Sequence, residues 1–444
     1  MRFNLFLLFS IALFSIHPGF VAAQTIDSPW SSYGIGDRSQ TDHGIFTGLG
    51  NSRISVLDST VLNFYNPSSY SSLSKGLPLY SIGMNGRYSQ LLTTKESTVN
   101  ISLVPDHFAM AFSVKNFVGI AFGLKPFTRM GYNITSRIKV GSDSIKYTYR
   151  GKGGSHEVFL GLSSDLYHSK STRISVGGNL GYIFGNTLKE RQSVLIGGNS
   201  IIGGIDWNEI RLTALHSEFA LNWQQKLGKN QSLLLTAVWE PRQTLNARHN
   251  SYLFYGNVDD PELYDTLSAL TNVDSPIDLA GRLQLGGCWF VRLKDQRKDN
   301  STRKSEFALH VNYSKALNQF LSANALNATE GWNFGLQYTP ETDFMENAGS
   351  IKFLENAHYR AGYYHLQLPY HFSGKTITDK GYTFGLGIPI TSFRTLSSVN
   401  ISLAYGERAD RIDPSYNERY VGFSLGVILA PSNFDKWFVK RKLD

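Results

Sequence analysis

The sequence predicts an all-β protein, a transmembrane antiparallel β-barrel of about 14 strands with an N-terminal hatch in its lumen. From Pro78 onward, apolar and polar residues alternate over segments of about ten residues, separated by turn residues. Aromatic residues gather at segment ends, and short and long connections alternate. No apolar run after the N-terminal leader approaches the roughly 20 residues of a membrane-spanning helix, which excludes a helical membrane protein.

The leader, residues 1–23, has the organisation of a secretory signal peptide. Arg2 precedes a mostly apolar run over 3–16, and Val21-Ala22-Ala23 resembles a cleavage site. His17-Pro18-Gly19 breaks the run well before membrane-helix length. We expect the mature chain to begin near Gln24 and to reach the outer membrane of a Gram-negative cell.

Residues 24–77 are expected to form the hatch. The stretch 45–77 is rich in glycine and serine and has apolar residues without a period, while Asn66-Pro67 indicates a turn leading into a short helix over 68–73. The apolar side chains need a dry environment, which a barrel lumen offers. They are Ile54, Val56, Leu57, Val61, Leu62, Phe64 and Tyr65.

Residues 78–430 are expected to form the barrel. Phe219, Leu221 and Trp223 alternate with polar or small residues, and so do the residues of 382–388 and 420–429. A soluble sandwich shows the same alternation, but the apolar stretches 174–184 and 278–291 exceed ordinary strands and match a tilted bilayer span. The expected strands are 79–92, 99–114, 117–138, 145–166, 173–188, 210–227, 232–247, 277–293, 306–315, 331–338, 358–372, 376–388, 397–406 and 418–429.

The connections follow from this assignment. Residues 115–116, 167–172 and 228–230 are expected to be short inner turns, and 189–209 and 248–276 long outer loops. The inner connections 295–305 and 340–357 are long for a barrel, which indicates a misplaced strand. Residues 431–444 are expected to be a periplasmic tail.

The ionisable residues give no catalytic or metal-binding pattern. His310 faces the same side as Asn312 and Ser314, which could mimic a lipase-like site, but a hydrated polar lumen explains the group more simply. Glu157, Glu218, Arg282 and Arg360 are expected to face inward and to form charge pairs there. The sequence therefore predicts no enzyme, no metal site and no cofactor. The net charge of +8 is scattered, so nucleic acid is not expected as a partner.

Pro105 and Pro126 fall within adjacent expected strands, where each removes a ladder hydrogen-bond donor. Both can simply mark strand ends or turns. The alternative hypothesis is a gap in the wall, through which an apolar solute leaves the lumen sideways.

The motifs GLGNSRIS (48–55), NFYNPSSYSSL (63–73) and GKGGSHEVFLGL (151–162) resemble outer-membrane transport proteins of the FadL/TodX type. The start SPWSSYGIGD and the tail NFDKWFVKRKLD look like the Bacteroidetes branch of these barrels. In that family a hatch lies inside a 14-stranded barrel, and hydrophobic ligands pass it towards a kinked wall. Gly48, Gly50, Asn66 and Pro67 match the hatch motif, whereas Ser68 replaces the usual alanine.

The resemblance implies passive uptake of hydrophobic solutes, long-chain fatty acids or similar molecules, with outer-membrane lipid and a hydrophobic small molecule as partners. The alternative is an accessory or plugging subunit of an outer-membrane assembly such as a secretion translocon, with an outer-membrane protein as partner.

Overall fold

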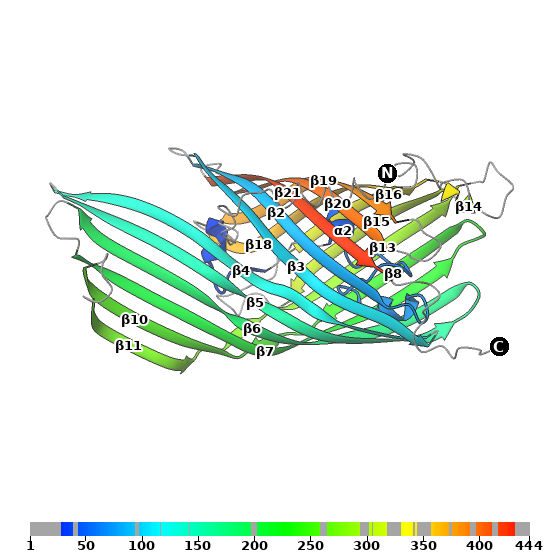
Figure 1. Ribbon diagram of the computed structural model, residues 1–444, viewed down its shortest axis with the longest axis horizontal. Helices are drawn as coiled ribbons and strands as arrows, with labels where there is room; N and C mark the ends of the chain where they lie inside the picture. Colours follow the sequence, from blue (N-terminus) through cyan, green and yellow to red (C-terminus); the bar gives the residue numbers. More distant parts are fainter. Residues whose placement is uncertain are drawn as a thin grey trace, which may run out of the picture.

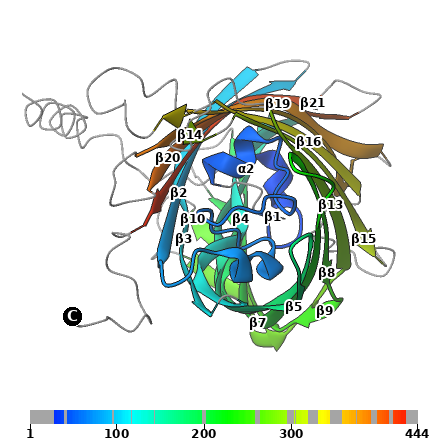
Figure 2. The same ribbon diagram turned by 90° about the vertical axis from the view of Figure 1, so that its right-hand side faces the viewer.

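The strands of the computed structural model form one closed antiparallel barrel, which Figure 2 shows end-on. Fourteen strands make the wall, and the first, β2, pairs with the last, β21, from Tyr80↔Leu429 to Thr93↔Tyr416. The predicted all-β barrel of about 14 strands is thus confirmed. The structure describes residues 28–38, 43–93, 97–115, 117–141, 143–196, 202–257, 264–293, 302–303, 305–317, 330–340, 342–343, 357–372, 375–390, 397–410 and 416–430.

Each wall strand pairs with its neighbours along the chain, which gives an up-and-down barrel. The wall strands are β2 (Leu79–Thr93), β3 (Ser97–Lys115), β4 (Val118–Val140), β5 (Asp143–His168), β6 (Thr172–Ile196), β7 (Ile202–Lys226), β8 (Gln231–Glu240), β13 (Gly281–Arg292), β15 (Glu306–Leu317), β16 (Glu330–Thr339), β18 (His358–Phe372), β19 (Lys375–Pro389), β20 (Ser398–Asp410) and β21 (Tyr416–Leu429).

The polarity of the wall is that of a membrane barrel. On β7, Phe219 and Leu221 are 48% and 46% exposed. Glu218, just before Phe219, and Asn222, just after Leu221, are buried. Apolar side chains thus face outward and polar ones inward, the reverse of a soluble sandwich. The alternation predicted for this strand is confirmed.

The expected outer loops 189–209 and 248–276 are wrong for most of their length. Strand β6 continues to Ile196 and β7 begins at Ile202, so the first is largely a hairpin. The second is largely the hairpin of β10 (Ala247–Asn257) and β11 (Tyr264–Asp274). Their outward positions mix apolar residues such as Trp207 and Phe254 with polar ones such as Glu190, so these stretches lack the regular alternation of a membrane strand.

The long strands give the barrel one raised side. Beyond the apolar membrane band, β7 pairs with one edge of β10, and β11 pairs with the other edge. Short strands β9 (Gln243–Leu245) and β12 (Ile277–Leu279) pair with each other and link this part to β8 and β13. Figure 1 shows β4–β7, β10 and β11 extending far past the other strands. We call these extended parts the tall wall.

The described N-terminal residues lie inside the barrel (Figure 2). They form 3₁₀ helix η1 (Pro29–Ser32), strand β1 (Asp37–Arg38), helix α2 (Gly44–Gly48) and 3₁₀ helix η2 (Pro67–Ser72), the last where a helix over 68–73 was expected. We call residues 28–38 and 43–77 the luminal segment. Among the described residues, no helix is long and apolar enough to cross a membrane.

The connections 295–305 and 340–357 carry two short strands, β14 (Thr302–Arg303) and β17 (Thr342–Asp343), which pair with each other. Most of the remainder of both connections lies outside the described residues, as do the leader 1–23 and the tail 431–444.

Candidate functional site in the barrel lumen

The luminal segment has an apolar core of its own that also packs on the wall. Phe46, Phe64 and Tyr70 are almost completely buried, and the rings of Phe46 and Phe64 meet edge-to-face at 6.5 Å. Phe159 of β5 joins the same cluster. The Tyr70 hydroxyl donates to Asn179 Oδ1 on β6 at 2.9 Å, and burial raises the pKa of this hydroxyl well above its ordinary value. Packing of this kind fixes the segment to the wall.

Gly48 and Gly50 lie where backbones approach closely. A Cβ added at Gly48 would lie 2.9 Å from the Cα of Gly385 on β19. Gly50 has φ +63°, and its N–H donates to Thr383 Oγ1 at 2.9 Å. Its carbonyl accepts from Asn333 Nδ2 at 2.7 Å. Only glycine combines this left-handed backbone with so little space.

Asn66 and Pro67 hold the opposite side of the segment against β6 and β7. Asn66 Nδ2 donates to the Ile54 carbonyl at 2.8 Å and to Asn222 Oδ1 on β7 at 3.0 Å. Pro67 begins η2 and lies on Gly177 of β6, where a Cβ would meet the Pro67 carbonyl carbon at 2.5 Å. The four motif residues therefore lie in two places, one pair near β16–β19 and the other near β6 and β7.

The short strand β1 joins three parts of the wall. It pairs with β4 through Asp37↔Arg129 and Arg38↔Thr128. Asp37 forms an ion pair with Arg408 on β20 at 2.9 Å, and Arg38 forms one with Glu240 on β8 at 2.9 Å. The luminal segment is thus fixed by charge at two separate places in the lumen.

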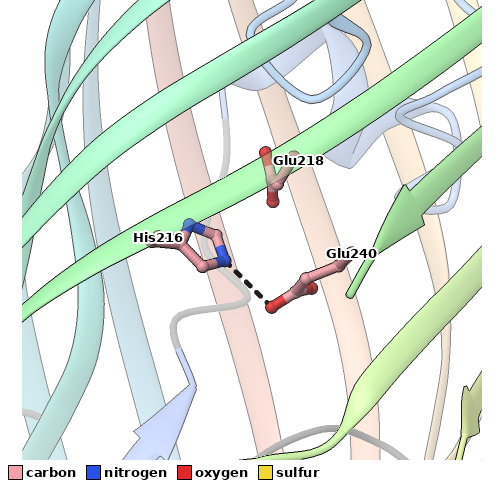
Figure 3. A group of neighbouring side chains, drawn as sticks. All are labelled: His216, Glu218 and Glu240. Carbon is pink, nitrogen blue, oxygen red and sulfur yellow. Dashed lines mark hydrogen bonds and ion pairs between the residues drawn. The ribbon is translucent and has the colours of Figure 1, made fainter. Parts of the chain in front are cut away.

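A buried charged network surrounds Glu240. His216 bridges two carboxylates, with Nδ1 2.9 Å from Glu157 Oε1 and Nε2 3.0 Å from Glu240 Oε1. Figure 3 shows the second of these bonds, with Glu218 beside it on β7. The cations Lys125, Arg282 and Arg38 lie within 4 Å of these carboxylates.

His216, Glu218 and Glu240 have the separation of a metal-ligand set, since their ligand atoms lie within 4.8 Å of one another. Three carboxylates already face three permanent cations in this network, and His216, whose two ring nitrogens each lie within hydrogen-bond distance of a carboxylate, adds further positive charge. A divalent cation would add an uncompensated double charge at a buried place, which is costly. The arrangement therefore fits an ion-pair network, and the inward orientation predicted for Glu157, Glu218 and Arg282 agrees with it.

Pro105 and Pro126 lie where β3 and β4 separate. The β3–β4 ladder runs from Lys115↔Val118 to Phe108↔Leu124, and among the described residues no backbone pair joins the two strands beyond it, where the Arg129 side chain of β4 donates to the Pro105 carbonyl of β3 at 3.0 Å. Register irregularities occur next to both prolines, at Met84↔Pro105 and at Pro126↔His156. Strand β1 pairs with β4 at this position. The plain reading of the prolines as strand ends or turns is wrong for both, because β3 and β4 continue through them.

Next to Pro105, three residues have the connectivity of a hydrolase triad. Ser81 Oγ lies 2.8 Å from His107 Nε2, and His107 Nδ1 lies 2.7 Å from Asp106 Oδ2. Ser81 is only 1% exposed, and the Phe64 ring lies 4.7 Å from the imidazole. Because Ser81 is buried and the imidazole packs on Phe64, these bonds fit a structural role beside the irregular β3 backbone.

His310 packs against the luminal segment. Its Nδ1 lies 3.1 Å from Ser55 Oγ, and its Nε2 lies 3.6 Å from Cys288 Sγ. The imidazole is buried, and its neighbours are structural partners, with no acidic orienting group among them. Arg360 is buried too, and it donates to Gln337 and Asn400.

Sequence reasoning missed His216, Arg38 and Lys125 as members of the charged network. Their partners come from strands far apart in the chain, so no local motif marks them. One local signal existed, because His216 stands two residues before Glu218 and so faces the same side of β7.

A closed membrane barrel whose lumen holds a bonded N-terminal segment is the class of protein that this geometry defines. The chain belongs to the BamG family, whose model matches residues 5–444. A comparison with curated protein sequences found no match.

Solved structures similar to this chain include two toluene transporters and a FadL homologue. The Pseudomonas putida toluene transporter TodX is 10% identical, with a TM-score of 0.48, over 89% of this chain and 99% of that one. The Ralstonia pickettii toluene transporter TbuX is 10% identical, with a TM-score of 0.48, over 88% and 99%. A Pseudomonas aeruginosa FadL homologue is 10% identical, with a TM-score of 0.46, over 89% and 99%. The fold assignment itself rests on the strand pairing of this chain.

Proposed function

We propose that this protein is a closed outer-membrane barrel that serves as an accessory subunit of an outer-membrane assembly. The observation that carries the proposal is the way the luminal segment is held. It is bonded to β4, β8 and β20 through Asp37 and Arg38, to β16 and β19 around Gly50, and to β7 through Asn66. A lumen filled and bonded on so many sides suits a structural subunit better than an open pore.

Several of these bonds involve charged groups in a buried place. Breaking one charge-assisted hydrogen bond costs about 1.5–3 kcal/mol, and leaving a buried charge unpaired costs more. Opening the lumen near Arg38 would break its bond with Glu240 and leave the buried charge of Glu240 with one partner fewer, so both free-energy costs would apply. Membership of the BamG family also favours the accessory-subunit function.

Native mass spectrometry after extraction from native membranes in mild detergent tests this proposal. We expect the barrel to appear in a stoichiometric complex with other outer-membrane proteins. A monomer without protein partners would contradict the proposal, and a monomer carrying lipid-like molecules would favour the channel described next.

The second candidate is a channel for passive uptake of hydrophobic solutes, such as long-chain fatty acids. The observation that favours it is the separation of β3 and β4 beyond Phe108↔Leu124, which leaves a break in the ladder at the height of Pro105 and Pro126. In this candidate, the luminal segment is a hatch and the break is a lateral exit. Strand β1 would have to leave the edge of β4 for a solute to pass.

Removal of residues 28–77 separates the two candidates in liposomes. A gated channel gains permeability to an apolar fluorescent fatty acid when the segment is deleted, provided that circular dichroism and heat-modifiable gel mobility show a folded barrel. Unchanged permeability of a folded deletion variant would rule out the hatch.

A further inference from the structure

On β4 and β5, the tall wall reverses the polarity of the barrel below it. In the membrane band, inward positions of β5 carry polar groups such as Glu157, and outward positions carry apolar ones such as Leu160. Towards the start of β5 this pattern is lost, and Ile145, Tyr147 and Tyr149 occupy the inward positions. The β5–β6 register has no shift between Ser144 and Asp165, so these residues continue the inward face.

Apolar residues on the inward face continue onto the neighbouring strands. Ile138↔Ile145 and Ile145↔Leu195 are cross-strand pairs and thus share one face of the sheet. Eight large apolar side chains on this face are 36–53% exposed. We call this set the inner wall face: Ile134, Ile138, Val140, Tyr149, Leu195, Ile202, Leu253 and Tyr255.

On β4 and β5 the opposite face is polar, whereas on β6, β7 and β10 it also carries apolar residues, among them Ile205, Trp207 and Phe254. On β4 it carries Thr135, Arg137 and Lys139, and on β5 it carries Arg150 and Lys152, all exposed. Water therefore suits the outward face of β4 and β5, and the inward face carries exposed large apolar side chains that a monomer in water rarely shows.

We propose that the inner wall face is the docking surface for a folded protein partner that presents a convex apolar surface from the outer side of the membrane. The inference rests on the proposed function as an accessory subunit, and it names the surface and the kind of partner. The side with the short turns Ser169–Ser171 and Gly228–Asn230 is taken as the inner side, as in other bacterial barrels.

The area fits a protein partner. Eight large apolar side chains exposed to this extent offer on the order of 700 Å², close to what one partner buries in a standard interface. The charges on the face also fit, since Arg191 and Asp206 lie 3.8 Å apart and compensate each other. The partner surface is therefore expected to be apolar rather than charged.

The geometry disfavours other occupants. The tall wall continues the curvature of the barrel (Figure 1), so its inward face is concave, and two concave faces cannot form a self-complementary contact between two copies. Bilayer lipid contacts the outward side of a barrel, whereas this face looks across the barrel mouth. A single small solute would cover only part of the surface.

Site-specific photo-crosslinking in native cells tests the proposal. Leu195 and Ile196 are neighbours on β6, 49% and 41% exposed, and face opposite sides of the wall. A photoreactive amino acid in place of Leu195 should crosslink one protein that native mass spectrometry also finds in stoichiometric complex with the wild-type barrel. The same group in place of Ile196 should not crosslink it.

A pair of double glutamate variants, one on each face of the wall, tests the same surface by the occupancy of the partner. The double variant Ile134→Glu with Leu195→Glu should lower the partner's occupancy at least about tenfold. The control Thr135→Glu with Ile196→Glu, on the outward face of the same strands, should retain the partner. Heat-modifiable gel mobility confirms that both variants fold, and their exposed positions favour this.

The outcomes separate the inference from the proposed function. A wild-type barrel that is extracted alone overturns both. A stoichiometric partner that both double variants retain overturns only the inference. Crosslinks from Leu195 to a second copy of this chain, or to lipid-like molecules, also overturn it.

Discussion

Replacement of Gly50 by alanine is the sharpest test of how the luminal segment is held. A methyl group at Gly50 would lie 2.6 Å and 2.7 Å from the backbone nitrogen and oxygen of Tyr363, and closer still to the Phe334 carbonyl oxygen. All three are backbone atoms of β16 and β18, so no side chain can rotate away. The segment must therefore move or the wall must deform.

The free-energy cost of Gly50→Ala to docking of the luminal segment has two contributions. Gly50 has φ +63°, and a left-handed backbone costs an alanine about 1–2 kcal/mol. Overpacking against fixed atoms costs about 1–3 kcal/mol. A total of about 3 kcal/mol would raise the displaced population roughly 100-fold.

Hydrogen exchange of residues 43–52, followed by mass spectrometry, measures this change. Gly422→Ala on β21 is the control, because a methyl group there meets its nearest neighbour at an ordinary 3.6 Å. We expect faster exchange in Gly50→Ala and unchanged exchange in Gly422→Ala. Equal exchange in the two variants would refute the packing argument.

Three further predictions concern charge, pH and the membrane band. Arg38→Ala removes the ion pair with Glu240 at 2.9 Å and should weaken docking of β1 by about 1.5–3 kcal/mol, seen as faster proteolysis of residues 28–38; unchanged cleavage would contradict it. Burial holds the pKa of His43 well below its ordinary value, and its Nδ1 accepts from the Ile45 N–H. Because the unfolded segment binds a proton first, protection of residues 43–50 should fall as the pH drops from about 7 to about 5, and constant protection would contradict this. Leu160→Arg should cost about 2–4 kcal/mol in urea unfolding from vesicles if this position lies near the bilayer centre, and a smaller loss would place it near an interface.

The alternation of polarity made the barrel predictable from sequence. Phe219, Leu221 and Trp223 fall on one face because a strand has a period of two, and membrane lipid requires that face to be apolar. The tall wall was not predictable by the same rule. Above the bilayer, lipid no longer constrains the outward face, so stretches such as 189–209 resemble loops while they continue the strands.

The lumen was predictable only in part. Glycines and Asn66-Pro67 indicated a segment that packs closely on other backbone, and the contacts of Gly48 and Gly50 show such packing. The charged network could not be predicted from the sequence. Glu157, His216 and Glu240 come from three strands, and their contacts can be inferred only once the strand register is known. Long-range pairing of this kind leaves no signature in one sequence without an alignment.

The contacts of the luminal segment with β21 have a consequence for how the barrel is made. Ser28 Oγ donates to Glu418 at 3.0 Å, Thr47 Oγ1 donates to Ser424 at 3.2 Å, and the His43 ring lies against Gly426. β21 is the last strand synthesised and the one that completes the ring by pairing with β2. Completion of the ring is therefore coupled thermodynamically to docking of the luminal segment, which is translated before the wall strands.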